Sequence, residues 1–588
     1  MSGVLFLRRR KQEDVNRDDG ITLGAGTVTA KEHRLPTSVL VRAGRDQTAT
    51  VQQNQQRVYA ASLISALTAL ALVIHGFHPY AEDGGLYLAG VKRVLDPALY
   101  QQSSVFVLGH LRFSLFAPAM AWLVRTSGLE LVTVALLVHM ASIWLTLAAA
   151  WMLAGRCFKG TTQRTGAVAL LTAWLTLPIA GTSLMLMDPY VTARSISTPL
   201  TMFALVWAID FFRSTNTGEH WNWRALSLTV VSLGIAAAAH PLMAAYGFGC
   251  VLTLATGVPR RRSARLLAIG ALGTAAVMAA LVLRMIAQPE TAAYQRVAMS
   301  RYYWFLSQWH WYELVGAIAP LAILAAAAWL ARSDRESGQY SLGWMGVTAG
   351  SIGMLTAAMF ARVGSVNHLV ARMQPMRIFQ LIYIVMIVLL GGALARWMGK
   401  SALRWSVTFA VLIGVMAFNE RITFPASDRV EIAEDEGEPA NNWVQAFEWI
   451  RKNTPKDAVF ALDADYITRK GEDAQSFRAI AERSALPDYS KDGGEAAITP
   501  GLADAWKAGE EAQTQLSERS DEDRIATLTP KRVGWVVLES KAVTSLPCDY
   551  TNAAVKVCRL QRGDTADGLR FSLRQPALPR EQTPQVQR

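Results

Sequence analysis

The sequence has few charged residues, few cysteines and none of the common nucleotide- or metal-binding motifs. Charged residues make up 18% of its 588 residues, whereas soluble proteins carry about 25%. No two of the four cysteines are spaced as Cys-x-x-Cys, which excludes a zinc ribbon or a dithiol redox motif. We find no Walker phosphate loop, His-Glu-x-x-His helix or Gly-x-Gly-x-x-Gly between a strand and a helix. These absences argue against ATP-driven pumps and soluble dehydrogenases.

Long apolar stretches dominate the rest of the chain. Hydrophobic residues account for 52% of the sequence, and the mean hydropathy is +0.20. A spanning helix needs about 20 apolar residues, because lipid offers no partners to backbone polar groups. We therefore predict an α-helical polytopic membrane protein with eleven spans. They are residues 58–77, 131–154, 167–184, 198–212, 226–240, 241–255, 266–286, 314–330, 342–360, 378–394 and 403–418.

The basic residues predict the orientation of these spans. A net charge of +12 would also suit a nucleic-acid-binding protein, but in a membrane protein lysine and arginine mark cytoplasmic loops. With the basic cluster at residues 8–11 in the cytoplasm, alternate counting places the other basic loops there and the C-terminus outside. This agreement needs two assignments. Residues 105–124 form an amphipathic helix on the outer interface, and the apolar run 226–255 is broken at His240-Pro241.

The resulting organisation has four parts. Residues 1–57 form a partly disordered cytoplasmic tail, and residues 58–418 form the transmembrane domain with an external loop at 78–130. Residues 419–574 form an extracytoplasmic α/β domain with a helix at 443–450, strands at 458–462 and 533–538, and a loop-rich middle. Residues 575–588 form a disordered tail. Cys548 and Cys558 can close a disulfide in an oxidising compartment, which favours the outward assignment.

Polar residues that a solvated surface does not explain gather on the first two outer loops. Tyr80, Glu82 and Asp83 directly follow the first span, and the structural alternative for Asp83 is to cap the helix that follows. Asp188 and Arg194 lie together on the second loop, where the alternative is an ordinary polar boundary of a span.

Three further positions add candidates for substrate binding. His240 lies where two short helices meet, and the alternative is a hydrogen-bonded helix end. The loop 288–313 is rich in tyrosine and tryptophan, as in an aromatic belt at a membrane interface or a surface that stacks on sugar rings. The fourth outer loop contains His368, Arg372 and Arg377. Arginines on the outer side depart from the positive-inside trend, and their guanidinium fork matches phosphate oxygens. We therefore predict a bound phosphate there.

An acidic pair after the first span, an interfacial helix, polar outer loops and an outward C-terminal domain resemble the C-type (GT-C) membrane glycosyltransferases. This superfamily includes protein mannosyltransferases, aminoarabinose lipid A transferases and oligosaccharyltransferase catalytic subunits. The resemblance implies a catalytic acid at Glu82 or Asp83, a second acidic position at Asp188 and a donor-phosphate arginine at Arg372 or Arg377. The sequence lacks a Trp-Trp-Asp motif and a second-loop Asp-x-Asp, so asparagine in a peptide is not the expected acceptor.

The resemblance predicts an enzyme that moves a sugar from a polyprenyl-phosphate donor to a glycan, lipid or protein acceptor on the extracytoplasmic face. Asp83 or Glu82 would take the acceptor proton, and repulsion between the adjacent carboxylates would give one of them a raised pKa. Arg194, His240, His368 and Tyr80 complete the predicted substrate-binding set. Asp83 and Asp188 offer oxygen ligands of the type that Mg²⁺ or Mn²⁺ prefers, so a divalent metal is possible, although nothing in the sequence requires it.

Two other classes of function fit parts of the pattern. A secondary transporter would have related halves and ionisable residues near the midplane, whereas the candidates lie at the outer ends of the spans. A non-catalytic scaffold for cell-envelope polymer export or assembly would need no acidic pair in the first loop. We expect a bacterial inner-membrane protein that contacts membrane lipids and a lipid-linked sugar, and no nucleic acid.

Overall fold

The computed structural model describes residues 37–560, apart from 217–220, 258–261, 288, 335–336, 433–440 and 470. The chain forms two units, residues 1–59 and residues 60–588. Of the first unit, the structure describes the start of helix α1 (Thr37–His75). The predicted tail 1–57 is therefore helical from Thr37, and the predicted tail 575–588 lies outside the described residues. All contacts below belong to the second unit.

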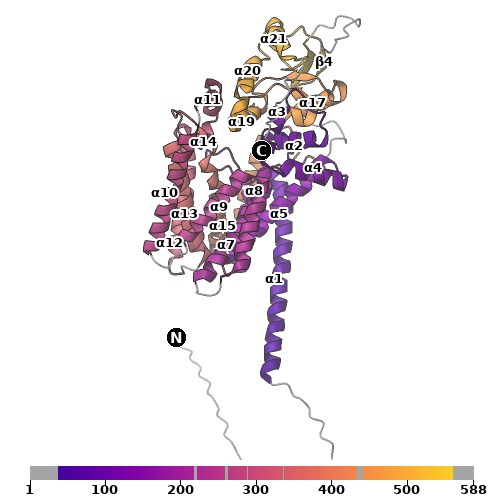
Figure 1. Cartoon of the computed structure of the whole chain (residues 1–588). Helices are drawn as coiled ribbons and strands as arrows, with labels where there is room; N and C mark the ends of the chain where they lie inside the picture. The colour runs from indigo at the N-terminus through magenta and orange to yellow at the C-terminus, as the bar shows by residue number, and fades with distance from the viewer. Residues whose placement is uncertain are drawn as a thin grey trace, which may run out of the picture. The chain divides into compact units, whose positions relative to one another are not determined.

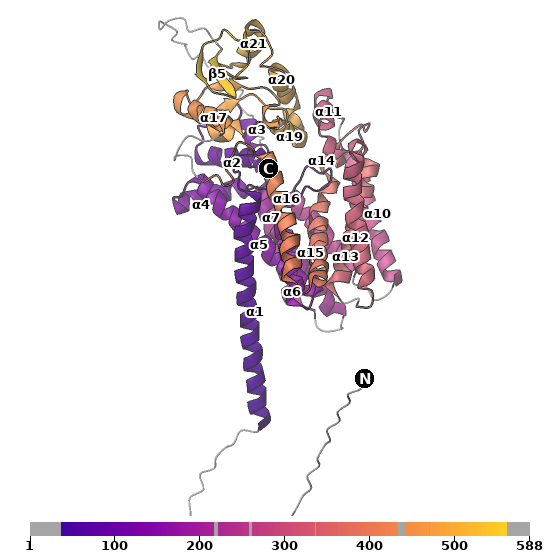
Figure 2. The ribbon, with the colours of Figure 1, turned by 180° about the vertical axis from the view of Figure 1, so that it is seen from behind.

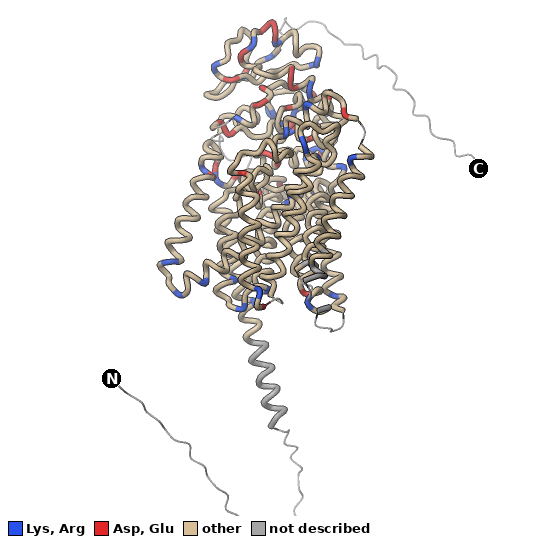
Figure 3. Tube along the Cα trace, turned by 90° about the vertical axis from the view of Figure 1, so that its left-hand side faces the viewer, with Lys and Arg blue, Asp and Glu red and all other residues tan. Residues whose placement is uncertain are grey.

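Within the described ranges, eight helices are long and apolar enough to cross a membrane. Most of them run side by side in a bundle (Figure 1). Lys, Arg, Asp and Glu are concentrated towards the ends of this bundle, with long uncharged stretches between (Figure 3). Besides α1, they are α5 (Leu131–Cys157), α7 (Ala193–Asn216), α10 (Arg262–Ile286), α12 (Trp311–Leu330), α13 (Gly338–Phe360), α15 (Phe379–Met398) and α16 (Ala402–Thr423).

Three predicted spans correspond to shorter helices. A continuous helix over 167–184 is wrong, because α6 (Thr161–Ala173) ends early and residues 174–192 form turns with a short bridge between Pro178 and Met185. Pro178 offers no backbone N–H to continue the helix. The predicted break at Pro241 is confirmed: α8 (Trp223–Ala239) ends before it and α9 (Pro241–Gly257) starts at it, a position where the missing N–H costs nothing.

The predicted single surface helix over 105–124 is also wrong. The segment divides into α3 (Ser104–Leu108), the 3-10 turn η1 (His110–Phe113) and α4 (Phe116–Ser127), with a bend of 99°. At the bend, the backbone N–H of Leu115 donates to the carbonyl of Ala238 at 2.9 Å. The Ser114 hydroxyl donates to the carbonyl of Ala239 at 2.5 Å. These bonds fix the turn against the end of α8.

The C-terminal region contains a five-stranded mixed sheet of order β2-β1-β3-β5-β4, with β1 parallel to β2 and β3 and the other pairs antiparallel. The predicted helix and both predicted strands are present as α17, β1 and β3. The predicted loop-rich middle is wrong, because it contains four helices (Figure 2). The elements are α17 (Asn442–Asn453), β1 (Val459–Ala461), α18 (Phe477–Ala481), β2 (Ser484–Ala485), α19 (Lys491–Ile498), α20 (Ala503–Gln513), α21 (Asp521–Leu528), β3 (Trp535–Glu539), β4 (Cys548–Thr551) and β5 (Val555–Arg559).

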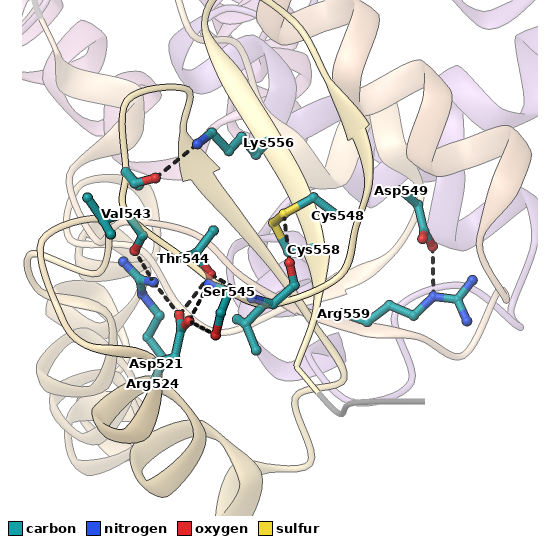
Figure 4. Close-up of a disulfide and its surroundings, with 12 residues drawn as sticks. Asp521, Arg524, Val543, Thr544, Ser545, Cys548, Asp549, Lys556, Cys558 and Arg559 are labelled. Atoms are coloured by element: carbon teal, nitrogen blue, oxygen red, sulfur yellow. Dashed lines mark hydrogen bonds and ion pairs between the residues drawn. A yellow bond between two sulfur atoms is a disulfide. The ribbon is translucent and has the colours of Figure 1, made fainter. Parts of the chain in front are cut away.

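Cys548 and Cys558 form a disulfide that joins β4 to β5 (Figure 4). The two residues are paired across the antiparallel ladder, and their Cα atoms lie 3.8 Å apart. In the segment that leads into β4, Thr544 and Ser545 donate hydrogen bonds to the carboxylate of Asp521, which also pairs with Arg524. The edge of the sheet is therefore held by a covalent bond and by a polar cluster around Asp521.

The first external loop and the C-terminal domain share one hydrophobic core. Leu88 and Val91 of α2 (Glu82–Leu95) belong to the same buried cluster as Phe477 and Ile480 of α18. The hydroxyl of Tyr100 reaches across and donates to the carbonyl of Arg478 at 2.8 Å. Burial of this kind contributes about 25 cal/mol for each Å² of apolar surface, so the packing fixes α2 against the domain.

Candidate functional site

A cavity of about 1450 Å³ lies between the C-terminal domain and the ends of the helices that face this domain. Its wall comes from α2, η1, the turns before α7, the α8–α9 junction, the end of α16 and helix α19. Tyr302 and Tyr303 of the 3-10 helix η2 (Tyr302–Trp304) also line the cavity. Segments far apart in sequence therefore meet around one space.

Seven of the nine predicted site residues line this cavity. They are Glu82, Asp83, Asp188, Arg194, His240, Arg372 and Arg377. The other two do not line it. His368 is buried and bound to Glu290 at 2.6 Å, and Tyr80 packs below Lys92, whose Nζ lies 5.3 Å from the ring centroid. Both positions are occupied by contacts within the protein.

Asp83 and Asp188 converge on one nitrogen of Arg194. Nη2 of Arg194 donates to Oδ2 of Asp188 at 2.9 Å and to Oδ2 of Asp83 at 3.1 Å. Arg194 and Asp188 are buried, with side chains 6% and 7% exposed. The structural alternative for Asp83 does not apply, because Ala81 occupies the cap position and Asp83 sits in the first turn of α2.

The C-terminal domain adds a second cation to this acidic group. Nζ of Lys491 pairs with Glu82 and lies 3.4 Å from Oδ1 of Asp83. Glu82 itself has a φ of +47°, a left-handed conformation that costs a residue other than glycine on the order of 1–3 kcal/mol. The ion pair with Lys491 helps to hold this strained residue at the start of α2.

The two aspartates differ in their protonation. Burial would raise the pKa of Asp83, but the charges of Lys491 and Arg194 outweigh burial and hold it well below its usual range. Burial raises the pKa of Asp188 in spite of Arg194, and the nearby charge of Asp83 adds to this rise. Asp83 is thus ionised at neutral pH, and the carboxylate with the raised pKa is Asp188 of the second loop.

This donor set does not fit a divalent cation. The oxygens of Asp83 and Asp188 that face each other are both bonded to Arg194, and Mg²⁺ needs near-octahedral oxygen ligands. Among the residues that the structure describes, no group of three His, Cys, Asp or Glu side chains could hold a metal. Arg194 supplies the positive charge that would otherwise be missing between the carboxylates.

Arg377 stands out among the cations of the cavity. It belongs to the turn η4 (Pro375–Ile378), after Gln374, which has a φ of +52°. Its Nε is buried and has no hydrogen-bond partner within the described part of the chain, where no acidic side chain forms an ion pair with it. Its charge lies close enough to lower the pKa of Asp83. Arg372, at the end of α14 (Leu369–Arg372), lines the same wall.

Sequence reasoning missed three cavity residues: His110, Lys491 and Glu495. His110 was assigned to the surface of an interfacial helix, and the bend at η1 moves it to the cavity wall. Lys491 and Glu495 are spaced for one face of a helix, but that spacing is equally typical of a solvated surface. His240 is a hydrogen-bonded helix end, because its Nδ1 accepts from the N–H of Met243 at 3.4 Å. It also lines the cavity, and its role in substrate binding stays a prediction.

Comparisons with solved structures give several matches, two of which are described here. No protein-family model matches the chain, and no curated protein matches it. The chain is similar to the oligosaccharyltransferase of Archaeoglobus fulgidus tethered with an acceptor peptide, with 10% identity and a TM-score of 0.42 over 82% of this chain and 69% of that chain. The oligosaccharyltransferase AglB from Archaeoglobus fulgidus, in complex with an inhibitory peptide and a dolichol-phosphate, gives 11% identity and a TM-score of 0.42. This match covers 83% of this chain and 70% of that chain.

Proposed function

We propose that this protein is a membrane glycosyltransferase that moves a sugar from a polyprenyl-phosphate donor to an acceptor on the extracytoplasmic face. Arg377 carries the proposal. A buried guanidinium nitrogen without a partner is costly, and Arg377 lines a large cavity with its buried Nε unbonded within the described residues. An anionic ligand would relieve that cost, and a phosphate suits the guanidinium geometry.

The apolar part of the cavity supports a lipid-linked donor. Leu242 on α9, Met373 and Ile422 on α16 all line it, and Ile422 is 59% exposed. These residues belong to or border apolar helices, so a phosphate at Arg377 would have a hydrocarbon surface beside it. A soluble nucleotide sugar would leave that surface uncovered.

The disulfide and the loop charges support an extracytoplasmic site. Disulfides persist in oxidising compartments, and the C-terminal domain that lines the cavity contains the Cys548–Cys558 bond. At the other ends of the helices, Arg156 lies in the last turn of α5 and Arg332 follows α12, as the positive-inside trend requires for a cytoplasmic side. A bacterial inner membrane satisfies both conditions.

The proposed reaction is a single displacement with inversion. The acceptor oxygen attacks the anomeric carbon, the bond from that carbon to the phosphate oxygen breaks, and the electron pair leaves with the phosphate. Arg377 and Arg372 stabilise the charge that grows there. Asp83 is a weak base because its pKa is low, but its negative charge stabilises the positive charge that develops on the sugar ring.

Transfer from defined donors tests this function. The protein is reconstituted in nanodiscs with a panel of labelled undecaprenyl-phosphate sugars and with donor-depleted envelope membranes as acceptor. We expect release of undecaprenyl phosphate with labelling of the acceptor, and a loss on the order of 10²-fold in Arg377→Ala. Arg296→Ala is the matched control, because Arg296 is 53% exposed and pairs with Glu511.

Two outcomes would overturn the proposal. One is a wild-type protein that neither binds undecaprenyl phosphate nor transfers sugar from any donor of the panel. The other is solute uptake into proteoliposomes without lipid-linked sugar, which would support a transporter. The position of the charges already disfavours a transporter, since the acidic and basic groups of the cavity lie at the outer ends of the spans.

A further inference from the structure

Helix α19 presents two charged residues to the cavity, one turn apart. Lys491 reaches Glu82 and Asp83 of α2, as described above. Glu495, four residues later, faces His110 of η1, with Oε1 of Glu495 3.0 Å from Nδ1 of His110. Residues four apart lie on the same face of a helix. One face of α19 therefore contacts both the acidic group of Glu82 and Asp83 and the side chain of His110.

His110 is held in a defined orientation at the cavity wall. Its side chain is 9% exposed and that of Glu495 is 3% exposed, and both line the cavity. The imidazole ring packs edge-on against Tyr87, with centroids 4.8 Å apart. Tyr87 lies one turn after Asp83 on α2. The histidine is thus a near neighbour of the acidic group without being part of it.

Both ring nitrogens of His110 are buried and lack a hydrogen-bond partner among the described residues. A buried polar atom left unbonded costs about 1–3 kcal/mol. Nδ1 lies at ion-pair distance from Glu495, a contact that becomes charged once the imidazole is protonated. Nε2 has no such carboxylate in the described part of the chain, so it is the atom left for a ligand.

Gly109 allows the carboxylate to approach the ring. A Cβ atom at this position would lie 2.5 Å from Oε2 of Glu495, which is inside van der Waals contact. Any larger residue next to His110 would push the carboxylate of Glu495 away. Glycine at position 109 therefore allows the His110–Glu495 contact.

We propose that His110 is the general base of the transfer reaction and that Glu495 positions it. This inference rests on the proposed glycosyltransferase function. As the acceptor oxygen bonds to the anomeric carbon, its proton passes to Nε2 of His110, and the electron pair of the broken bond leaves with the phosphate. Glu495 stabilises the imidazolium, which returns the proton to solvent after the product departs.

The assignment divides the chemistry between two groups. Asp83 stays ionised beside Arg194 and Lys491 and acts through its charge, whereas His110 carries the proton. A histidine suits proton transfer near neutral pH better than an aspartate whose ion pairs stabilise its charged form. Both groups face the same cavity, so one substrate can meet both.

Chemical rescue tests the role of His110. In His110→Ala, we expect transfer to fall about 10²- to 10⁴-fold, while binding of undecaprenyl phosphate, measured by tryptophan fluorescence, stays at the wild-type level. Added imidazole should restore part of the rate in proportion to its concentration. Glu495→Gln should also lower the rate without lowering phosphate binding. His310→Ala is the control, because His310 caps α12 outside the cavity lining and should neither lose rate nor respond to imidazole.

The outcomes separate this inference from the proposed function. Wild-type transfer with full activity in His110→Ala, or a slow His110→Ala that binds the phosphate normally and ignores imidazole, overturns His110 as the base. A wild-type protein without transfer from any donor overturns the proposed function instead. Full activity in Glu495→Gln removes the positioning role of Glu495.

Discussion

Nη2 of Arg194 donates a buried hydrogen bond to the carboxylate of Asp188 at 2.9 Å, and the same nitrogen also donates to Asp83. An arginine in this place makes a metal ion unnecessary for neutralising the two carboxylates. We therefore expect transfer to persist after treatment with EDTA and removal of the chelator. Elemental analysis of the purified protein, together with the transfer assay, checks this. Activity that vanishes with EDTA and returns with Mg²⁺ or Mn²⁺ would contradict it.

Removing the charge of Asp83 should be far more damaging than removing that of Glu82. Asp83→Asn loses the charge next to the reacting carbon and frees one bond of Arg194, so we expect a fall in kcat on the order of 10²-fold or more. The Glu82 side chain is 48% exposed, and Glu82→Gln keeps its shape. We expect a much smaller effect there. Equal activity of both variants and the wild type would remove the carboxylates from the reaction.

Lys491→Met should raise the pKa of Asp83 without neutralising it. The pKa of Asp83 lies low because Lys491 and Arg194 outweigh the effect of burial, and Arg377 contributes in the same direction. Arg194 and Arg377 still hold Asp83 ionised at neutral pH, so we expect kcat to fall less in Lys491→Met than in Asp83→Asn. Transfer assays of both variants check this. A Lys491→Met protein as inactive as Asp83→Asn would contradict it.

Asp521 should stabilise the C-terminal domain in a pH-dependent way. Hydrogen bonds from Ser545 and Thr544 and the pairing with Arg524 outweigh burial and lower the pKa of Asp521 to about 2. A lowered carboxylate pKa stabilises the fold above the unfolded pKa and loses this effect as pH falls towards 2. Asp521→Asn should cost about 1 kcal/mol at pH 7 after allowance for screening. Thermal unfolding at pH 7 and pH 3 should show the difference shrinking.

Asp549→Asn provides the control for this experiment (Figure 4). Asp549 pairs with Arg559, whose side chain is 56% exposed, and exposed pairs contribute little. A loss of stability in Asp549→Asn equal to that in Asp521→Asn would contradict the role given to the hydrogen bonds of Asp521.

The state of the cysteines reports the side of the membrane. In membranes isolated without reductant, we expect Cys548 and Cys558 to resist alkylation until they are reduced, and a cross-linked peptide to appear by mass spectrometry. Free thiols at both positions in freshly isolated membranes would contradict an oxidising compartment for this domain. Cys157 and Cys250, which are not paired, serve as internal references.

The site was predictable where membrane topology alone brings residues together. Asp83, Asp188, Arg372 and Arg377 all follow or precede apolar runs on the same side, so alternate counting is enough to place them at one end of the bundle. Their convergence on a single cavity follows from the packing of the bundle, which the sequence does not encode in any local pattern. His368 shows what topology alone cannot predict. Its position on an outer loop predicted a substrate-binding residue, whereas its side chain contacts Glu290 within the protein.

The contribution of the C-terminal domain could not be predicted. Lys491 and Glu495 lie about 400 residues after the acidic pair, and only tertiary packing brings α19 to α2. The same holds for His110, because its place depends on the bend between η1 and α4 rather than on hydrophobic periodicity. Local patterns predicted the helix and strands of the domain correctly, since those depend on residues near each other in the chain.

Because α2 and α18 share one core, the loop that contains α2 and the C-terminal domain depend on each other for folding. A protein that ends after α16 would expose Leu88 and Val91 to water and would lose Lys491, Glu495 and the far wall of the cavity together. Shortened forms of this chain should therefore be aggregation-prone as well as inactive, and separate expression of the two halves should yield function only if they associate before either is degraded.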